Sequence, residues 1–181
     1  MKELFSAKRL CRAAVIAALY IVLTYAFGML SSQGFLQIRP AEALCILPLF
    51  YAEAVPALFL GCMLANIISL FGIYDVFFGS LATLFAAICT WLVGKLFRNA
   101  FARISLGGLF PILMNAFLIP LIIVLLYGDM GGYETATIAY WAYFASLFCT
   151  QAIWVYALGT PLYFFVDKMQ KKNVSAFCTK K

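Results

Sequence analysis

The sequence contains no histidine and few charged residues, and both shortages limit what the protein can be. Only 11% of its 181 residues are charged, whereas a typical soluble domain carries roughly a quarter. Its six cysteines form no CxxC pair, so neither a zinc site nor a thiol redox motif is indicated. The GxxxxGK[ST] loop of ATPases is also missing. The sequence therefore predicts no metal, no cofactor and no enzymatic activity.

Long apolar runs are the most abundant feature of the chain. Hydrophobic residues make up 66% of it, and the mean hydropathy is +1.00. A membrane-spanning helix needs about 20 mostly apolar residues. Uncharged runs cover residues 13–38, 76–94, 104–128 and 135–166, and a more ambiguous run covers 43–74. We therefore predict a multi-pass protein of the cell membrane, with residues 1–181 forming a single domain embedded in the lipid bilayer.

Residues 41–71 decide how many spans the chain has. As one helix they would be roughly 46 Å long, with Glu53 near the middle of the membrane. Two short helices, over about 40–52 and 57–71, instead leave Glu53 in a tight turn. The second of them then leads into an outer loop, "FGIYDVFFG" at 71–79. With six spans, 12 of the 13 basic residues fall on one side of the membrane, and Arg39 alone falls on the other. The positive-inside rule favours this arrangement over five spans.

The predicted fold is therefore all-α: a bundle of six transmembrane helices with short second and third helices, and with short basic termini in the cytoplasm. Membrane orientation accounts for the net charge of +6, so we predict no nucleic-acid partner. Arg39 and Glu42 lie at the outer mouth of the bundle, where polar groups are candidates for function. A local Arg39–Glu42 pair that caps a helix is the alternative interpretation.

Two further patterns concern the spans themselves. Asn66 and Asn115 are polar residues in apolar helices, where they serve either binding or interhelical hydrogen bonding. In the first helix, Ala14 and Ala18 are four residues apart, a spacing that lets another helix approach closely. That face either docks on a partner or packs within the bundle.

Three segments resemble the queuosine-precursor (QueT) family of S components, the substrate-binding subunits of energy-coupling factor (ECF) transporters. They are "IRPAEAL" at 38–44, "GCMLANIISLFGIYDVFFGSLATLFAA" at 61–87 and "PILMNAF" at 111–117. The resemblance implies a subunit that captures its substrate outside the cell. It also implies docking, through Ala14 and Ala18, on a membrane T component driven by two cytoplasmic ATPase subunits. Substrate-binding residues are then expected near the outer ends of the helices and in the outer loops: Arg39, Glu42, Asn66, Asp75, Asn115, Tyr133, Glu134 and Trp141.

The resemblance implies a 7-deazaguanine substrate, such as 7-aminomethyl- or 7-cyano-7-deazaguanine. A guanine edge presents two adjacent donors that suit a carboxylate, and its O6 suits an amide or arginine donor. The same residue types would also serve an S component for thiamine, riboflavin or biotin. A small membrane enzyme or scaffold is the alternative of a different class. An enzyme would need a nucleophile–base pair or metal ligands within the bundle, and the sequence offers neither.

Overall fold

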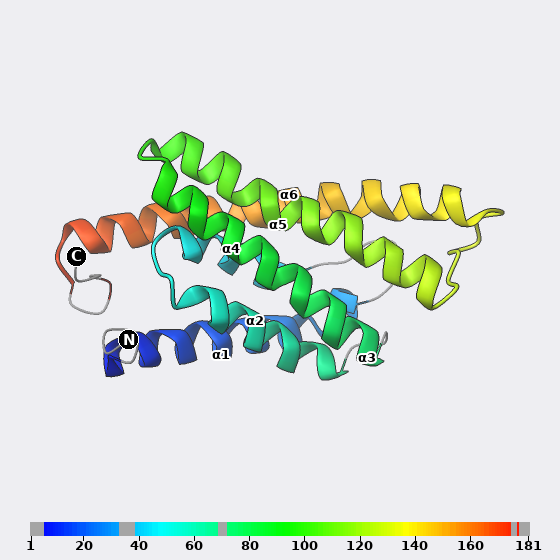
Figure 1. The fold of residues 1–181 in the computed structure, drawn as a ribbon, viewed down its shortest axis with the longest axis horizontal. Helices are drawn as coiled ribbons and strands as arrows, with labels where there is room; N and C mark the ends of the chain where they lie inside the picture. The colour runs from blue at the N-terminus through cyan, green and yellow to red at the C-terminus, as the bar shows by residue number, and fades with distance from the viewer. Residues whose placement is uncertain (1–5, 33–38, 69–71, 175–176, 178–181) are drawn as a thin grey trace.

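The computed structural model describes residues 6–32, 39–68, 72–174 and 177, and every regular element among them is helical. Figure 1 shows the long helices running side by side along the length of the molecule. The elements are α1 (Ala7–Ser32), η1 (Pro40–Leu49), α2 (Ala54–Ala65), η2 (Asn66–Ile68), α3 (Gly72–Tyr74), η3 (Asp75–Gly79), α4 (Ser80–Leu96), α5 (Ala100–Leu121), η4 (Ile122–Leu126) and α6 (Ala136–Lys171).

Four helical segments of the described chain are long and apolar enough to cross a membrane, and two more are apolar but shorter. The long ones are Ala7–Phe27, Asp75–Leu96, Ala100–Leu126 and Ala136–Lys171. The shorter ones are Pro40–Leu49 and Ala54–Ala65, which confirms that the second and third helices are short. Their predicted bounds were wrong by a few residues. The second ends at Leu49 rather than 52, and the third runs from Ala54 to Ala65 rather than from 57 to 71, a residue outside those described.

The second helix is a 3₁₀ helix, η1, and this geometry divides its side chains among three faces. Residues three apart eclipse one another in a 3₁₀ helix. One face carries Glu42 and Cys45, and another carries Leu44 and Leu47. All ten residues of η1 are buried. Tertiary contacts on every side therefore stabilise a 3₁₀ run much longer than the usual three or four residues.

Close packing holds the C-terminal end of η1. A β-carbon at Gly94 of α4 would lie 2.6 Å from the Leu49 carbonyl oxygen, so only glycine permits this approach. The Arg103 guanidinium donates a hydrogen bond to the same carbonyl and lies 5.0 Å from the centre of the Phe50 ring. Arg12 of α1 forms a 2.5 Å ion pair with Glu53, in the turn that follows η1. These contacts fix η1 and, with it, the position of Glu42.

The predicted outer loop around residues 71–79 is instead largely helical. Gly72–Tyr74 forms α3, and Asp75–Gly79 forms the π-helical turn η3, which continues directly into α4. A π turn leaves carbonyl groups without their usual α-helical partners. Here Asn66 donates to the Asp75 carbonyl at 3.0 Å, and the Ser80 hydroxyl donates to the Val76 carbonyl. These side chains support the turn and bring Asp75 into the bundle.

The first turn of α1 and the last turn of α6 lie at the same end of the molecule (Figure 1). The start of α1, the α4–α5 connection and the end of α6 meet there, and these segments carry every described basic residue except Arg39. The opposite end holds the segment between η4 and α6, with Asp129 and Glu134. The bundle is therefore polarised in charge along its length.

Candidate substrate-binding site

The carboxyl group of Glu42 lies inside the bundle, with a protein donor on each oxygen. Its residue is 1% exposed. The Tyr20 hydroxyl of α1 donates to Oε1 at 3.0 Å, and the Cys45 thiol donates to Oε2 at 3.2 Å. Cys45 reaches it because residues i and i+3 share a face of a 3₁₀ helix. The two bonds hold the carboxyl group in one orientation.

A second set of polar side chains links α2, η3 and α4. The Asn66 amide, besides its bond to the Asp75 carbonyl, donates to the Cys62 sulfur at 3.4 Å. The Thr83 hydroxyl of α4 lies 3.3 Å from the same sulfur and donates to it. Asn66, Cys62 and Thr83 are all buried. The end of α2 is thereby connected to the start of α4.

Arg39 joins these two sets. It is buried directly before η1, and its guanidinium interacts electrostatically with Asp75, Glu42 and Tyr20. Asp75 is itself only 2% exposed. Burying charged groups costs free energy unless opposite charges lie close together. Arg39 and the two acidic side chains meet this condition because the fold brings them together. We refer to the joined set as the polar cluster: Tyr20, Arg39, Glu42, Cys45, Cys62, Asn66, Asp75 and Thr83.

Gly79 provides the room that the polar cluster needs. A β-carbon at this position would lie 2.8 Å from Asp75 Oδ1 and 2.9 Å from Asn66 Nδ2. Real β-carbons essentially never approach other atoms so closely. Both polar side chains therefore occupy space that any other residue at position 79 would take.

Two buried amides in α5 and α6 extend the polar interior. Asn115 is buried on α5. The antiparallel helices α4 and α5 are joined where the Thr90 hydroxyl donates to the Gly107 carbonyl at 2.8 Å. Asn115 lies about two turns from that bond along α5, and Thr83 lies about two turns from it along α4, so the two residues are at about the same level. Gln151 of α6 is 1% exposed, and neither its Nε2 nor its Oε1 has a hydrogen-bond partner among the described residues.

Gln151 shares a face of α6 with residues that contact the core elements. Val155 and Gly159 follow it at intervals of one helical turn. A β-carbon at Gly108 of α5 would lie 3.1 Å from Val155 Cγ1, and one at Gly159 would lie 3.4 Å from the carbonyl oxygen of Ala43 in η1. The unpaired amide therefore lies on the face of α6 that packs between α5 and η1. An unsatisfied buried amide is costly, and a ligand is one partner that would satisfy it.

Comparison with known proteins identifies the family. A family model described as "QueT transporter" matches residues 10–168, which include the whole polar cluster. The chain belongs to the QueT transporter family. It is similar to the queuosine precursor transporter QueT of Lactococcus lactis subsp. cremoris (strain MG1363), with 39% identity over 72 residues. That alignment covers 39% of this chain and 42% of the relative, so less than half of either protein is aligned. No solved structure matches the chain.

QueT membership confirms the family inferred from the three sequence segments. The structure brings four of the predicted substrate-binding residues into the polar cluster: Arg39, Glu42, Asn66 and Asp75. It therefore supports a larger network than the local Arg39–Glu42 helix cap considered from the sequence. Glu42 takes its hydrogen bonds from Tyr20 and Cys45.

Three other predicted residues, Tyr133, Glu134 and Trp141, are not members of the QueT polar cluster. Trp141 is 55% exposed and packs on Tyr140 and Phe144, with ring centroids 5.4 Å away in each case. Glu134 is exposed, and the half-buried Tyr133 packs against the Ile119–Leu147 hydrophobic cluster. Any role of these three residues in substrate binding stays a prediction.

Five buried residues of this QueT chain were not among the predicted site residues: Tyr20, Cys45, Cys62, Thr83 and Gln151. A usable signal existed for two of them. Tyr20 follows Ala13 and Ala17 on the inner face of α1, where an aromatic hydroxyl has no water to bond with, and Gln151 is an amide within a long apolar run. Cys45, Cys62 and Thr83 gave no comparable signal, because a small residue in a span usually packs without a special role.

Proposed function

We propose that this QueT-family chain is the substrate-binding S component of an ECF-type importer in the cell membrane and captures a 7-deazaguanine queuosine precursor. The observation that carries the proposal is the polar cluster, buried in an otherwise apolar bundle. Ionisable groups inside a transmembrane bundle are costly and generally mark a substrate or ion path. The family match makes a transported substrate the expected occupant.

The guanine edge of such a ligand suits Glu42. Its N1–H and 2-amino groups are adjacent donors, and a carboxylate accepts two parallel hydrogen bonds. An ionised carboxylate has about four lone-pair sites, of which Tyr20 and Cys45 use two. Two sites thus remain for the ligand. Charge-assisted bonds of this kind are stronger than neutral ones, which fits capture at low concentration.

The charges of the polar cluster favour a cationic ligand. The polar cluster contains two acidic residues, Glu42 and Asp75, and one basic residue, Arg39. An uncompensated buried charge is strongly destabilising. The ammonium group of 7-aminomethyl-7-deazaguanine would supply the missing positive charge, whereas the neutral 7-cyano compound would not. We therefore propose the aminomethyl compound as the preferred ligand.

Gln151 is a further member of the proposed site. Its amide offers one donor and one acceptor that are buried without partners among the described residues. Nε2 suits the O6 acceptor of a deazaguanine, and Oε1 suits a ring N–H. A ligand that bonds to both atoms would remove the cost of leaving them unpaired.

The proposed orientation places both termini in the cytoplasm. The described basic residues other than Arg39 gather at the end of the bundle where α1 begins and α6 ends, and the positive-inside rule assigns such an end to the cytoplasm. The polar cluster then lies nearer the outer side, where η1 begins at Pro40 and η3 begins at Asp75.

The proposed T-component contact lies on α1. Ala14 and Ala18 are exposed, whereas Ala17 faces α2, where a β-carbon at Gly61 would lie 3.1 Å from the Ala17 carbonyl oxygen. Small residues at a spacing of four allow close approach of another helix. This surface is therefore free for the membrane T component, which would couple the S component to two cytoplasmic ATPase subunits.

The test is isothermal titration of the purified protein with 7-aminomethyl-7-deazaguanine, its 7-cyano counterpart, thiamine, riboflavin and biotin. The aminomethyl compound should bind most tightly. Glu42→Gln replaces an acceptor oxygen with a donor that opposes a ligand donor. Affinity should then fall by roughly tenfold to several hundredfold, the effect of an unsatisfied or lost charge-assisted bond.

Two comparisons complete this test. An analogue lacking the 2-amino group should bind the native protein more weakly than 7-aminomethyl-7-deazaguanine does. The Glu42→Gln substitution should reduce the affinity for this analogue by a smaller factor than the affinity for the complete ligand. Asp167→Asn is the matched control, because Asp167 is paired with Lys171 at the other end of the bundle, 2.7 Å away. Tighter binding of thiamine, riboflavin or biotin would reject the deazaguanine. Unchanged affinity in Glu42→Gln would reject the role of this carboxylate.

A further inference from the structure

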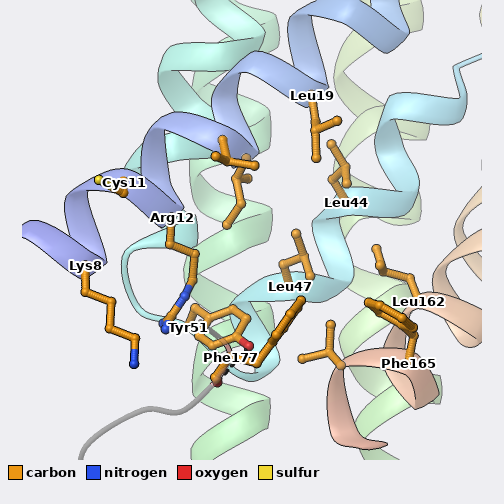
Figure 2. A pocket seen from close by; sticks show the side chains of 13 residues that line it. Lys8, Cys11, Arg12, Leu19, Leu44, Leu47, Tyr51, Leu162, Phe165 and Phe177 are labelled. Carbon is orange, nitrogen blue, oxygen red and sulfur yellow. Dashed lines mark hydrogen bonds between the residues drawn. The ribbon is translucent and has the colours of Figure 1, made fainter. Parts of the chain in front are cut away.

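A groove of about 430 Å³ lies between α1 and α6, at the end of the molecule where α1 begins and α6 ends. Figure 2 shows its side chains converging from both helices. Leu44 and Leu47 of η1 line it between them, on a different face of η1 from the one that carries Glu42 and Cys45. The groove is therefore separate from the polar cluster.

The groove is apolar along its length and basic at one end. Leu162, Phe165 and Val166 line it from α6, while Lys8 and Arg12 lie at the end nearest the start of α1 (Figure 2). Arg12 is engaged by Glu53 at 2.5 Å and lies 4.1 Å from the centre of the Tyr51 ring.

Lys8 differs from Arg12 in its surroundings. It is exposed, and no ion pair joins it to another of the residues that the structure describes. Among the described residues that line the groove, the charged ones are Lys8 and Arg12, and Glu53 offsets only Arg12, with which it is paired. The surplus positive charge would attract an anionic group.

The dimensions of the groove match one lipid chain. Along α1 it extends from Lys8 to Leu19, which is roughly 16 Å at the α-helical rise of 1.5 Å per residue. One leaflet supplies half of a hydrocarbon core about 30 Å thick, so its acyl chains cover a similar distance. The cationic end of the groove is therefore one leaflet away from its far apolar end.

The proposed T-component contact lies outside this groove. Ala14 and Ala18, the proposed contact for the T component, do not line it. A hydrocarbon chain fits the space without competing for that contact.

We propose that this groove binds one acyl chain of an anionic phospholipid, with the phosphate against Lys8 and Arg12. The inference rests on the membrane embedding in the proposed function, but not on the transported ligand. Long basic side chains extend toward the headgroup region while their stems stay on apolar surface, which is the geometry required here.

The test uses the full chain in nanodiscs of phosphatidylglycerol and phosphatidylcholine, in equal amounts and with identical acyl chains. Protein is released into detergent, and retained lipids are counted by native mass spectrometry. Phosphatidylglycerol should be enriched about fivefold among them, the factor expected for one basic side chain near the membrane surface. Lys8→Glu should abolish the enrichment, and Val15→Trp, at the exposed rim, should reduce retention of both lipids.

Matched controls keep these changes specific to the groove. Arg9→Glu makes the same kind of charge change beside Lys8, and Leu10→Trp adds the same bulk to an exposed position, but neither residue lines the groove. Both controls should retain phosphatidylglycerol. Equal retention of the two lipids, or enrichment that survives Lys8→Glu, would overturn the proposal. Deazaguanine titration of Lys8→Glu separates the two hypotheses, because its affinity should be unchanged whether or not lipid is lost.

Discussion

Tyr20 and Glu42 are 22 residues apart in the sequence and are joined by a 3.0 Å hydrogen bond inside the bundle. Tyr20 belongs to α1, whose other side exposes Ala14 and Ala18. One rigid helix thus connects the polar cluster with the proposed docking face. A ligand that bonds to Glu42 would act, through Tyr20, on the helix that approaches the T component.

The first prediction concerns this bond. Tyr20→Phe removes the donor to Glu42 Oε1 with little change in shape, and hydrogen bonds to charged groups contribute about 1.5–3 kcal/mol. We expect affinity for 7-aminomethyl-7-deazaguanine to fall by about tenfold to a hundredfold in isothermal titration. Tyr25→Phe is the control, because its hydroxyl donates to the Leu64 carbonyl at 3.2 Å, away from the cluster. Equal losses in the two variants would show that Tyr20 only supports the fold.

Gln151→Leu should separate stability from binding. Replacing an unsatisfied buried amide with an apolar side chain removes a desolvation cost of about 1–3 kcal/mol. The ligand-free variant should therefore unfold at a higher temperature, while its deazaguanine affinity falls. Gln170→Leu, which removes a 3.2 Å bond to the Phe177 carbonyl, should leave affinity unchanged and give no gain in stability. Native affinity in Gln151→Leu would exclude Gln151 from the site.

Gly79→Ala tests the space beside Asp75 and Asn66. The new methyl group would lie 2.8 Å from Asp75 Oδ1, so the Asp75 side chain must move. We expect at least a tenfold loss of ligand affinity, since displacement weakens every bond that depends on this geometry. Gly159→Ala adds the same group where the nearest atom is 3.4 Å away, an ordinary contact, and should bind normally. Comparable ligand affinities of the two variants would show that the polar cluster does not take part in ligand binding.

The docking face is tested by bulk on α1. Ala14→Trp and Ala18→Trp should leave ligand titration unchanged and abolish uptake in cells that contain the T component and ATPases, because bulk prevents close helix approach. Leu92→Trp, at an exposed position of α4, is the control and should transport normally. Normal uptake by both alanine variants would assign the partner contact to another surface.

Orientation is tested with single cysteines in a background lacking the native six. A cysteine at Gly132 should react with an impermeant thiol reagent applied to whole cells, and one at Ala100 should react only after lysis. These positions lie at opposite ends of the bundle, in the segment before α6 and at the start of α5. Labelling of position 100 in intact cells would contradict cytoplasmic termini.

The sequence by itself determined the class of the protein and the number of its apolar helices. Long uncharged runs predict membrane-spanning helices, because a backbone in hydrocarbon must satisfy its polar groups internally. Charge placement distinguished two short helices from one long one, and the structure has Pro40–Leu49 and Ala54–Ala65. Glu42 and Asn66 stood out because polar residues are rare in such runs.

Tertiary structure decided the conformation of η1, the burial of Asp75 and the partners of the polar groups. Local patterns predicted a loop around Asp75, but Asn66 binds its carbonyl from another helix and stabilises a π turn. Nothing local to Tyr20 indicates that it bonds to Glu42, and nothing near Gln151 shows that its amide lacks a partner among the described residues. Hydropathy depends on neighbours along the chain, whereas a buried hydrogen bond depends on which distant elements pack together. The polar cluster therefore exists only once α1, η1, α2 and α4 have assembled.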